Sequence, residues 1–273
     1  VRVWDLATGE QARHLAGHSG PVRSVAVAEL DGRPHAVTTG YVGSVWVWDL
    51  ATGEQVRQLV GHTDWVFSVV VAELDGRSHA VTASSDNSVR VWDLATGEQV
   101  RQLVGHTDWV FSVAVAELDG RPHAVTTGYA GSVRVWDLAT GEQTRHLAGH
   151  TGPVWAVVVA ELDGRPHAVT ASSDGSVRVW DLATGEQARQ LVGHTSSIRS
   201  VVVAELDGRP HVLTTGYDMS LRVWDLTTGA CLTTYRLPVA TSPVAVAADG
   251  TVVLGVGDDV VVLSLAPLIR RLP

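Results

Sequence analysis

The sequence predicts an all-β protein built from one four-stranded antiparallel unit that is copied in tandem. Trp-Asp pairs begin at Trp4, Trp48, Trp92, Trp136, Trp180 and Trp224, and Gly-His pairs end at His18, His62, His106, His150 and His194. Both series advance by 44 residues at each step. A period of about 40–45 residues that carries these two dipeptides is typical of a repeat of four short strands. Val dominates the apolar residues and only two Phe occur, which also favours strands over helices.

The repeat at 61–104 shows why each strand is expected. Val66 to Leu74 is almost continuously apolar, as an inner strand buried on both faces should be. Asp75-Gly76 suits a type I′ turn, whose two central residues have positive φ. The later residues predict strands at 78–84, 89–94 and 98–104, joined by turns at Asp86-Asn87 and Thr96-Gly97. The last strand alternates polar and apolar residues and is expected at the outer edge.

These motifs resemble the WD-repeat β-propeller family, clearly over about residues 1–236 and in degenerate form over 237–273. The resemblance implies a single domain over residues 1–273, made of four-stranded antiparallel blades. This domain would comprise an outer half-blade at 1–16, blades at 17–60, 61–104, 105–148, 149–192 and 193–236, and a degenerate last blade at 237–273. In that last blade we expect strands at 244–248, 252–255 and 260–265, with turns at 249–250 and 258–259. All twenty basic residues are Arg and none is Lys, a coding bias that favours a bacterial source.

The number of blades has two solutions. We favour seven for the parent domain, with the first blade incomplete here. If the chain closes on itself, Gln11 to Ala16 would become the fourth strand of the last blade and give six.

Composition excludes several classes of protein. The formal net charge of −9 argues against binding to a nucleic-acid backbone. No run of 18 apolar residues occurs, so no membrane span is expected. Cys231 is the single cysteine, so no intrachain disulfide is expected, and we predict a cytoplasmic location.

One constellation looks catalytic and is better explained as structure. His62, Asp86 and Ser84 or Thr82 would suit a nucleophile, a base and a group that orients the base. The family resemblance instead implies a buried chain of hydrogen bonds within each blade, and copying in every blade indicates a structural role. We therefore expect no enzyme activity and no catalytic residues. The implied tetrads are His62, Thr82, Asp86 and Trp92; His150, Thr170, Asp174 and Trp180; and His194, Thr214, Asp218 and Trp224.

Two repeats depart from this pattern. The Asp position holds Val42 in one repeat and Ala130 in the other, so His18 and His106 are expected to lack a carboxylate partner at this position. Trp46 replaces the Arg of the other copies, either for packing or for a contact on the side of the blade. A second histidine series at His35, His79, His123, His167 and His211 places one imidazole in each blade. That spacing is too wide to share an ion, so we expect no metal and no cofactor.

The positions that differ between repeats carry the functional prediction. Two kinds of position hold aromatic and Arg residues: those on either side of the Val that follows Gly-His, and the one just before the Asp position. The family resemblance implies that these positions line one face. The expected partner-binding residues are Arg23, Tyr41, Trp65, Phe67, Trp109, Phe111, Tyr129, Trp155, Arg199 and Tyr217. Exposed Trp, Tyr and Arg are typical of binding hot spots.

The sequence thus predicts a non-catalytic scaffold that binds a protein or peptide, as a regulatory or signalling domain of a larger bacterial protein. The alternatives are a self-assembling structural fragment that associates through its incomplete blade, and a small-ligand-binding or enzymatic propeller that uses the central funnel.

Overall fold

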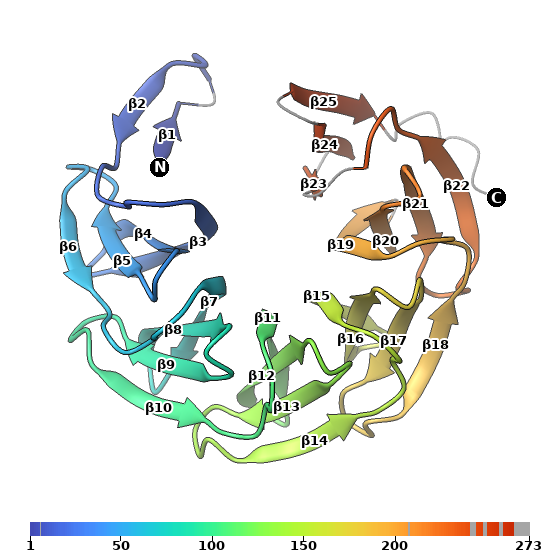
Figure 1. The fold of residues 1–273 in the computed structure, drawn as a ribbon, viewed down its shortest axis with the longest axis horizontal. Coiled ribbons are helices and arrows are strands. Elements are labelled where there is room, and N and C mark those ends of the chain that lie inside the picture. Colours follow the sequence, from blue (N-terminus) through green and yellow to red (C-terminus); the bar gives the residue numbers. More distant parts are fainter. Residues whose placement is uncertain (6, 207, 241–243, 248–249, 257–258, 265–273) are drawn as a thin grey trace. The chain divides into compact units, whose positions relative to one another are not determined.

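The protein is all-β, as predicted. The computed structural model describes residues 1–5, 7–206, 208–240, 244–247, 250–256 and 259–264, and within these ranges it contains strands and no helix. None of the described residues therefore forms a helix long and apolar enough to cross a membrane. The strands form five four-stranded sheets, one two-stranded sheet and one three-stranded sheet (Figure 1).

The strand order within each four-stranded sheet follows the chain. The first sheet holds β3 (Val22–Leu30), β4 (Arg33–Gly40), β5 (Val45–Asp49) and β6 (Gln55–Gln58). The second holds β7 (Val66–Leu74), β8 (Arg77–Ser84), β9 (Val89–Asp93) and β10 (Gln99–Leu103). The third holds β11 (Val110–Leu118), β12 (Arg121–Gly128), β13 (Val133–Asp137) and β14 (Gln143–Leu147). The fourth holds β15 (Val154–Leu162), β16 (Arg165–Ser172), β17 (Val177–Asp181) and β18 (Gln187–Leu191). The fifth holds β19 (Ile198–Leu206), β20 (Arg209–Gly216), β21 (Ser220–Asp225) and β22 (Cys231–Arg236).

The second sheet matches its sequence prediction closely. The bounds of β7 agree at both ends, and those of the other three strands agree within one residue. Asp75 and Gly76 have φ values of 51° and 71°, which confirms the turn with two positive φ angles.

The two smaller sheets contain the first two strands and the last three strands of the described residues. β1 (Arg2–Trp4) pairs with β2 (Gln11–His14), so residues 11–14 lie in one sheet with the first Trp-Asp strand. β23 (Val244–Val246), β24 (Thr251–Val256) and β25 (Asp259–Ser264) form the three-stranded sheet. The turns expected at 249–250 and 258–259 include residues 249 and 258, which lie outside the described residues. The blade count of the parent domain stays a prediction.

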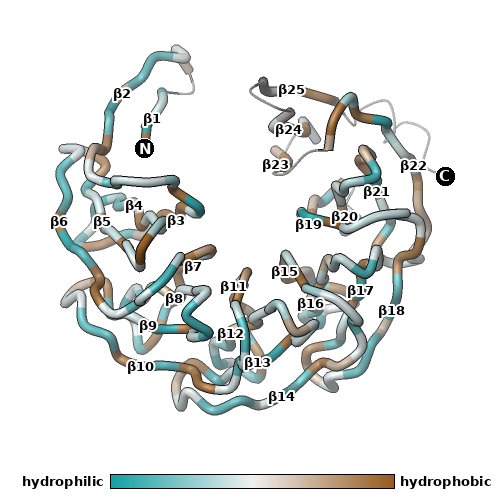
Figure 2. The backbone as a smooth tube through the Cα atoms, in the orientation of Figure 1, coloured by the Kyte–Doolittle hydropathy of each residue, from teal (hydrophilic) through white to brown (hydrophobic). Residues whose placement is uncertain are grey.

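The contacts divide the chain into two compact units. The first unit comprises residues 1–126 and 136–144, and the second comprises residues 127–135 and 145–273. In the first unit, buried side chains of one sheet pack against the next, as Val47 and Val69 do beside Trp92. In the second unit, Val179 and Val201 pack in the same way beside Trp224. The outer strands β14 and β18 are mostly hydrophilic, as expected for exposed edges (Figure 2).

Arginines on the outer strands join neighbouring sheets within each unit. In the first unit, Arg57 Nε donates to the carbonyl of Leu94 at 3.0 Å, and the same guanidinium bonds to the Ala95 carbonyl. In the second unit, Arg189 Nε donates to the carbonyl of Leu226 at 3.2 Å. Each bond ends on the turn between the third and fourth strands of the next sheet, so the repeat of one Arg fixes successive sheets together.

Candidate partner-binding face

The second sheet contains a buried chain of hydrogen bonds between side chains. Trp92 Nε1 donates to Thr82 Oγ1 at 2.9 Å, and Thr82 Oγ1 lies 2.7 Å from His62 Nε2. His62 Nδ1 lies 2.8 Å from a carboxylate oxygen of Asp86. Because an ionised carboxylate only accepts, Nδ1 carries the proton and Nε2 accepts from the Thr82 hydroxyl. The chain is complete without any external group.

The second compact unit contains the same arrangement twice. Trp180 and Trp224 each donate to a threonine at 2.9 Å, Thr170 and Thr214. These hydroxyls lie 2.8 Å from His150 Nε2 and 2.7 Å from His194 Nε2. The two Nδ1 atoms lie 2.8 Å from Asp174 and 2.9 Å from Asp218.

Burial and hydrogen bonding set the charges of one such pair. Burial opposes ionisation of Asp174, yet hydrogen bonds from Ser176 and His150 outweigh it and lower the pKa of Asp174 to about 2. Burial also lowers the pKa of His150, and Asp174 reverses only part of that effect. The pair is therefore a carboxylate beside a neutral imidazole at neutral pH.

The aspartate of each Trp-Asp pair has a role that the sequence reasoning did not assign. Asp93 Oδ1 accepts from the backbone N–H groups of Ala95 at 2.8 Å and Thr96 at 3.0 Å. Its other oxygen forms a 2.8 Å salt bridge with Arg77. Asp93 thus closes the turn between the third and fourth strands, and the Asp-x-x-Thr-Gly pattern was the available signal.

The first sheet lacks the aspartate, and its turn has a different shape. Val42 occupies the position with φ of 54°, a conformation that β-branched residues rarely adopt. His18 Nδ1 lies 3.3 Å from Ser44 Oγ instead of a carboxylate. Trp46 stacks on Trp48 with ring centroids 5.5 Å apart and planes at 15°, so its role in this sheet is packing.

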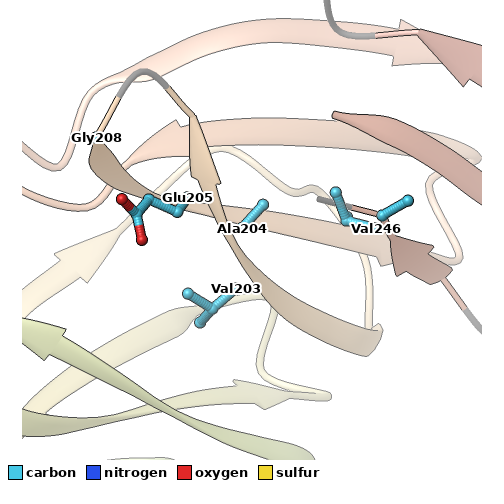
Figure 3. A pocket seen from close by; sticks show the side chains of 6 residues that line it. Val203, Ala204, Glu205, Gly208 and Val246 are labelled. Carbon is cyan, nitrogen blue, oxygen red and sulfur yellow. The ribbon is translucent and has the colours of Figure 1, made fainter. Parts of the chain in front are cut away.

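The second histidine series bonds to the backbone. His79 Nδ1 donates to the Arg77 carbonyl at 2.9 Å, and the corresponding histidines do the same in the other four-stranded sheets. In the part of the chain that the structure describes, no three His, Cys, Asp or Glu side chains are placed to share a metal ion. Of the described residues that line a pocket of about 380 Å³ beside Val203 and Val246, only Glu205 has an ionisable side chain (Figure 3).

A β-bulge places the variable side chains at the start of the inner strands. Between β7 and β8 the pairing passes from Val66 to Ser68, which leaves Phe67 as the extra residue. The same register shift singles out Arg23, Trp155 and Arg199 in three other sheets. A bulge re-aims its side chain away from the regular ladder. The residues at this bulge differ between repeats, and the sheet pairing leaves them free to differ.

In the second and fifth sheets, backbone hydrogen bonds bring the other variable positions to the same end of the sheet. Ser85 N donates to the Trp65 carbonyl at 2.9 Å, and Tyr217 N donates to the Ser197 carbonyl at 2.9 Å. The residue before the Asp position therefore lies beside the residue that precedes the inner strand.

The aromatic cluster of the first unit is continuous. Its members are Arg23, Tyr41, Trp65, Phe67, Trp109 and Phe111. The rings of Tyr41 and Trp65 have centroids 4.6 Å apart, and Phe67 lies 6.1 Å from Trp65 and 6.4 Å from Trp109. The Arg23 guanidinium lies 4.6 Å above the Trp65 ring.

A smaller cluster, composed of Trp155, Arg199 and Tyr217, occupies the second unit. The Arg199 guanidinium carbon lies 3.7 Å from the Trp155 ring centroid and 5.6 Å from that of Tyr217. Both distances are within the range of a cation–π interaction.

Exposure separates contact residues from supporting ones. Trp109 is 46% exposed and Tyr217 is 55% exposed, and Tyr41 and Tyr129 are similar. Phe111 is only 7% exposed, so the structure places this predicted binding residue beneath the face, where it packs against Phe67 and Trp109.

Comparison with known families agrees with the repeat. A family model described as WD domain, G-beta repeat matches residues 53–93, 97–137, 141–181 and 185–225. A comparison with curated proteins gives no match.

Proposed function

Because the chain belongs to the WD domain, G-beta repeat family, whose repeats generally mediate protein interactions, we propose that it is a non-catalytic scaffold that binds a protein or peptide segment. The binding surface is the set of residues at the starts of the inner strands and in the turns between the second and third strands. A regulatory role within a larger bacterial signalling protein belongs to the same proposal.

The observation that supports this proposal most is the continuous aromatic cluster of the first unit. Trp109 and Tyr41 are close to half exposed, and the rings of Trp65 and Phe67 connect them. Large aromatic side chains grouped on a surface are typical of binding sites, because they lose much contact with water when a partner covers them.

Selection from a library of random unmodified peptides displayed on phage tests the proposal. We expect the full chain to enrich a set of peptides, and the double variant Trp65→Ala and Trp109→Ala to lose them. Val60 and Val104 supply the matched control, because they are exposed valines of the same unit that follow the outer strands β6 and β10. Val60→Ala with Val104→Ala should enrich the same peptides as the unmodified chain.

Circular dichroism and thermal melting of each variant show whether it is folded. A folded tryptophan double variant that enriches the same peptides would contradict the proposal.

A second candidate function is self-association, and the first sheet favours it. Val25 is 58% exposed, whereas Val69, its counterpart one repeat later, is 4% exposed. Val27 and Trp4 are also exposed, at 64% and 48%. Sedimentation measured over a range of protein concentrations tests this candidate. We expect Val25→Asp to abolish any association, and association unchanged by that substitution would exclude this face.

A further inference from the structure

Most arginines of the repeat are engaged by the protein itself. Arg33, Arg77, Arg121 and Arg165 form salt bridges with the aspartates of the Trp-Asp pairs. Arg57, Arg101 and Arg189 bond to carbonyls of the next sheet. These contacts recur from repeat to repeat, so they are part of the scaffold.

Arg23 and Arg199 are different in position and in contacts. Both occupy the bulge position, where the second repeat has Phe67 and the fourth has Trp155. Within the described residues, neither guanidinium donates a hydrogen bond or forms a salt bridge. Each lies instead over a tryptophan, Arg23 on Trp65 and Arg199 on Trp155.

This stacking prepares a guanidinium for a carboxylate. A guanidinium is planar, and its five N–H donors point outward in that plane. An indole has no oxygen or nitrogen acceptor for these donors, so they remain available to an acceptor on a partner. Contact with the ring also restricts the side chain, so less conformational entropy is lost when an acceptor binds.

We propose that each cluster binds an acidic peptide segment, in which an Asp or Glu carboxylate receives the N–H donors of Arg23 in the first unit or of Arg199 in the second. This inference rests on the proposed function and adds the chemistry of the partner. Apolar side chains of the segment cover the exposed rings of the same clusters. Each cluster offers one stacked guanidinium, which matches one carboxylate in charge and in two-point geometry. A phosphorylated segment would favour several arginines around one group.

The experiment extends the phage selection with charge reversal. We expect peptides selected by the full chain to be enriched in Asp and Glu over the starting library. The double variant Arg23→Glu and Arg199→Glu should lose these peptides and enrich Lys and Arg instead. Arg209→Glu is the matched control, because Arg209 is exposed and begins β20, at the far end of the β19–β20 hairpin from Arg199. It should select as the unmodified chain does.

Affinity measurements on one enriched synthetic peptide for each cluster sharpen the result. Arg23→Gln should weaken binding about tenfold for a peptide bound at the first cluster, and Arg199→Gln for a peptide bound at the second, as expected for a lost hydrogen bond between charged groups. Either peptide with one Glu replaced by phosphoserine should bind no more tightly.

Three outcomes would overturn the inference. Enriched peptides that depend on Trp65 and Trp109 but are neutral or basic would leave the scaffold function standing and remove the acidic partner. Tighter binding of the phosphorylated peptide would replace the carboxylate by a phosphate. No enrichment by the unmodified chain would remove both the inference and the proposed function.

Discussion

Two adjacent threonines of β20 should respond in opposite directions to the same substitution. Thr214 Oγ1 accepts from Trp224 Nε1 at 2.9 Å and lies 2.7 Å from His194 Nε2. Thr215 is equally buried, and its hydroxyl has no hydrogen-bond partner among the described residues. Valine has nearly the same shape as threonine and replaces the hydroxyl by a methyl group.

The magnitudes follow from the hydrogen bonds lost in each case. Thr214→Val leaves the indole N–H and an imidazole nitrogen unpaired inside the sheet, at about 1–3 kcal/mol for each buried group, so we expect a loss of about 2–6 kcal/mol. Thr215→Val removes a buried polar group that has no partner, so we expect a gain of about 1 kcal/mol. The repeats at Ala83 and Ala171 already have an apolar residue at the Thr215 position, and both are fully buried.

Urea denaturation, monitored by tryptophan fluorescence and circular dichroism, measures both changes in stability. A shift of the midpoint with an unchanged slope reports a change in stability alone. If Thr215→Val destabilises the protein, its hydroxyl has a partner and the assignment above is wrong. If Thr214→Val leaves the midpoint unchanged, the hydrogen bonds of Thr214 do not stabilise the sheet.

Two further predictions concern the carboxylates and histidines of the tetrads. Ala130→Asp should stabilise the protein by about 1 kcal/mol through a new carboxylate–imidazole hydrogen bond. The turn there resembles the one at Asp174, because Gly131 (φ 73°) follows Ala130 as Gly175 (φ 78°) follows Asp174. A melting temperature that falls or stays constant would count against this prediction. Stability should decrease as the pH falls below about 6.5, because His150 has a lowered pKa in the folded state and must be neutral there. A second decrease should occur between about pH 4 and pH 2, where Asp174, whose pKa is lowered to about 2, gains a proton. Urea midpoints measured across this range should fall in both steps, and a constant midpoint from pH 7 to pH 5 would contradict the histidine assignment.

The repeat made much of the fold predictable. A continuous apolar run marked β7, and Asp75-Gly76 marked the turn after it, because both signals are local and each has a direct physical cause. The tetrad partners were accessible through the family resemblance. The salt bridge of Asp93 was not, because it joins residues of two paired strands whose register the hydrophobic pattern does not reveal.

The bulge and the stacked arginines were also beyond the sequence. One additional residue at Phe67 leaves the apolar run unbroken, so no change in pattern marks it. The contact of Arg23 with Trp65 depends on the placement of two successive sheets, and burial of Phe111 depends on its neighbours. Sequence could identify the variable positions but not which of them contact solvent.

The residue inserted at the start of each inner strand has a consequence for the evolution of this chain. Because that residue is not part of the ladder, exchanging it changes chemistry at the surface while the strand pairing below remains intact. New specificities can therefore arise by single substitutions, one blade at a time, without a compensating change elsewhere. The same property makes Phe67 and its equivalents natural positions for randomisation when a binder of chosen specificity is engineered on this scaffold.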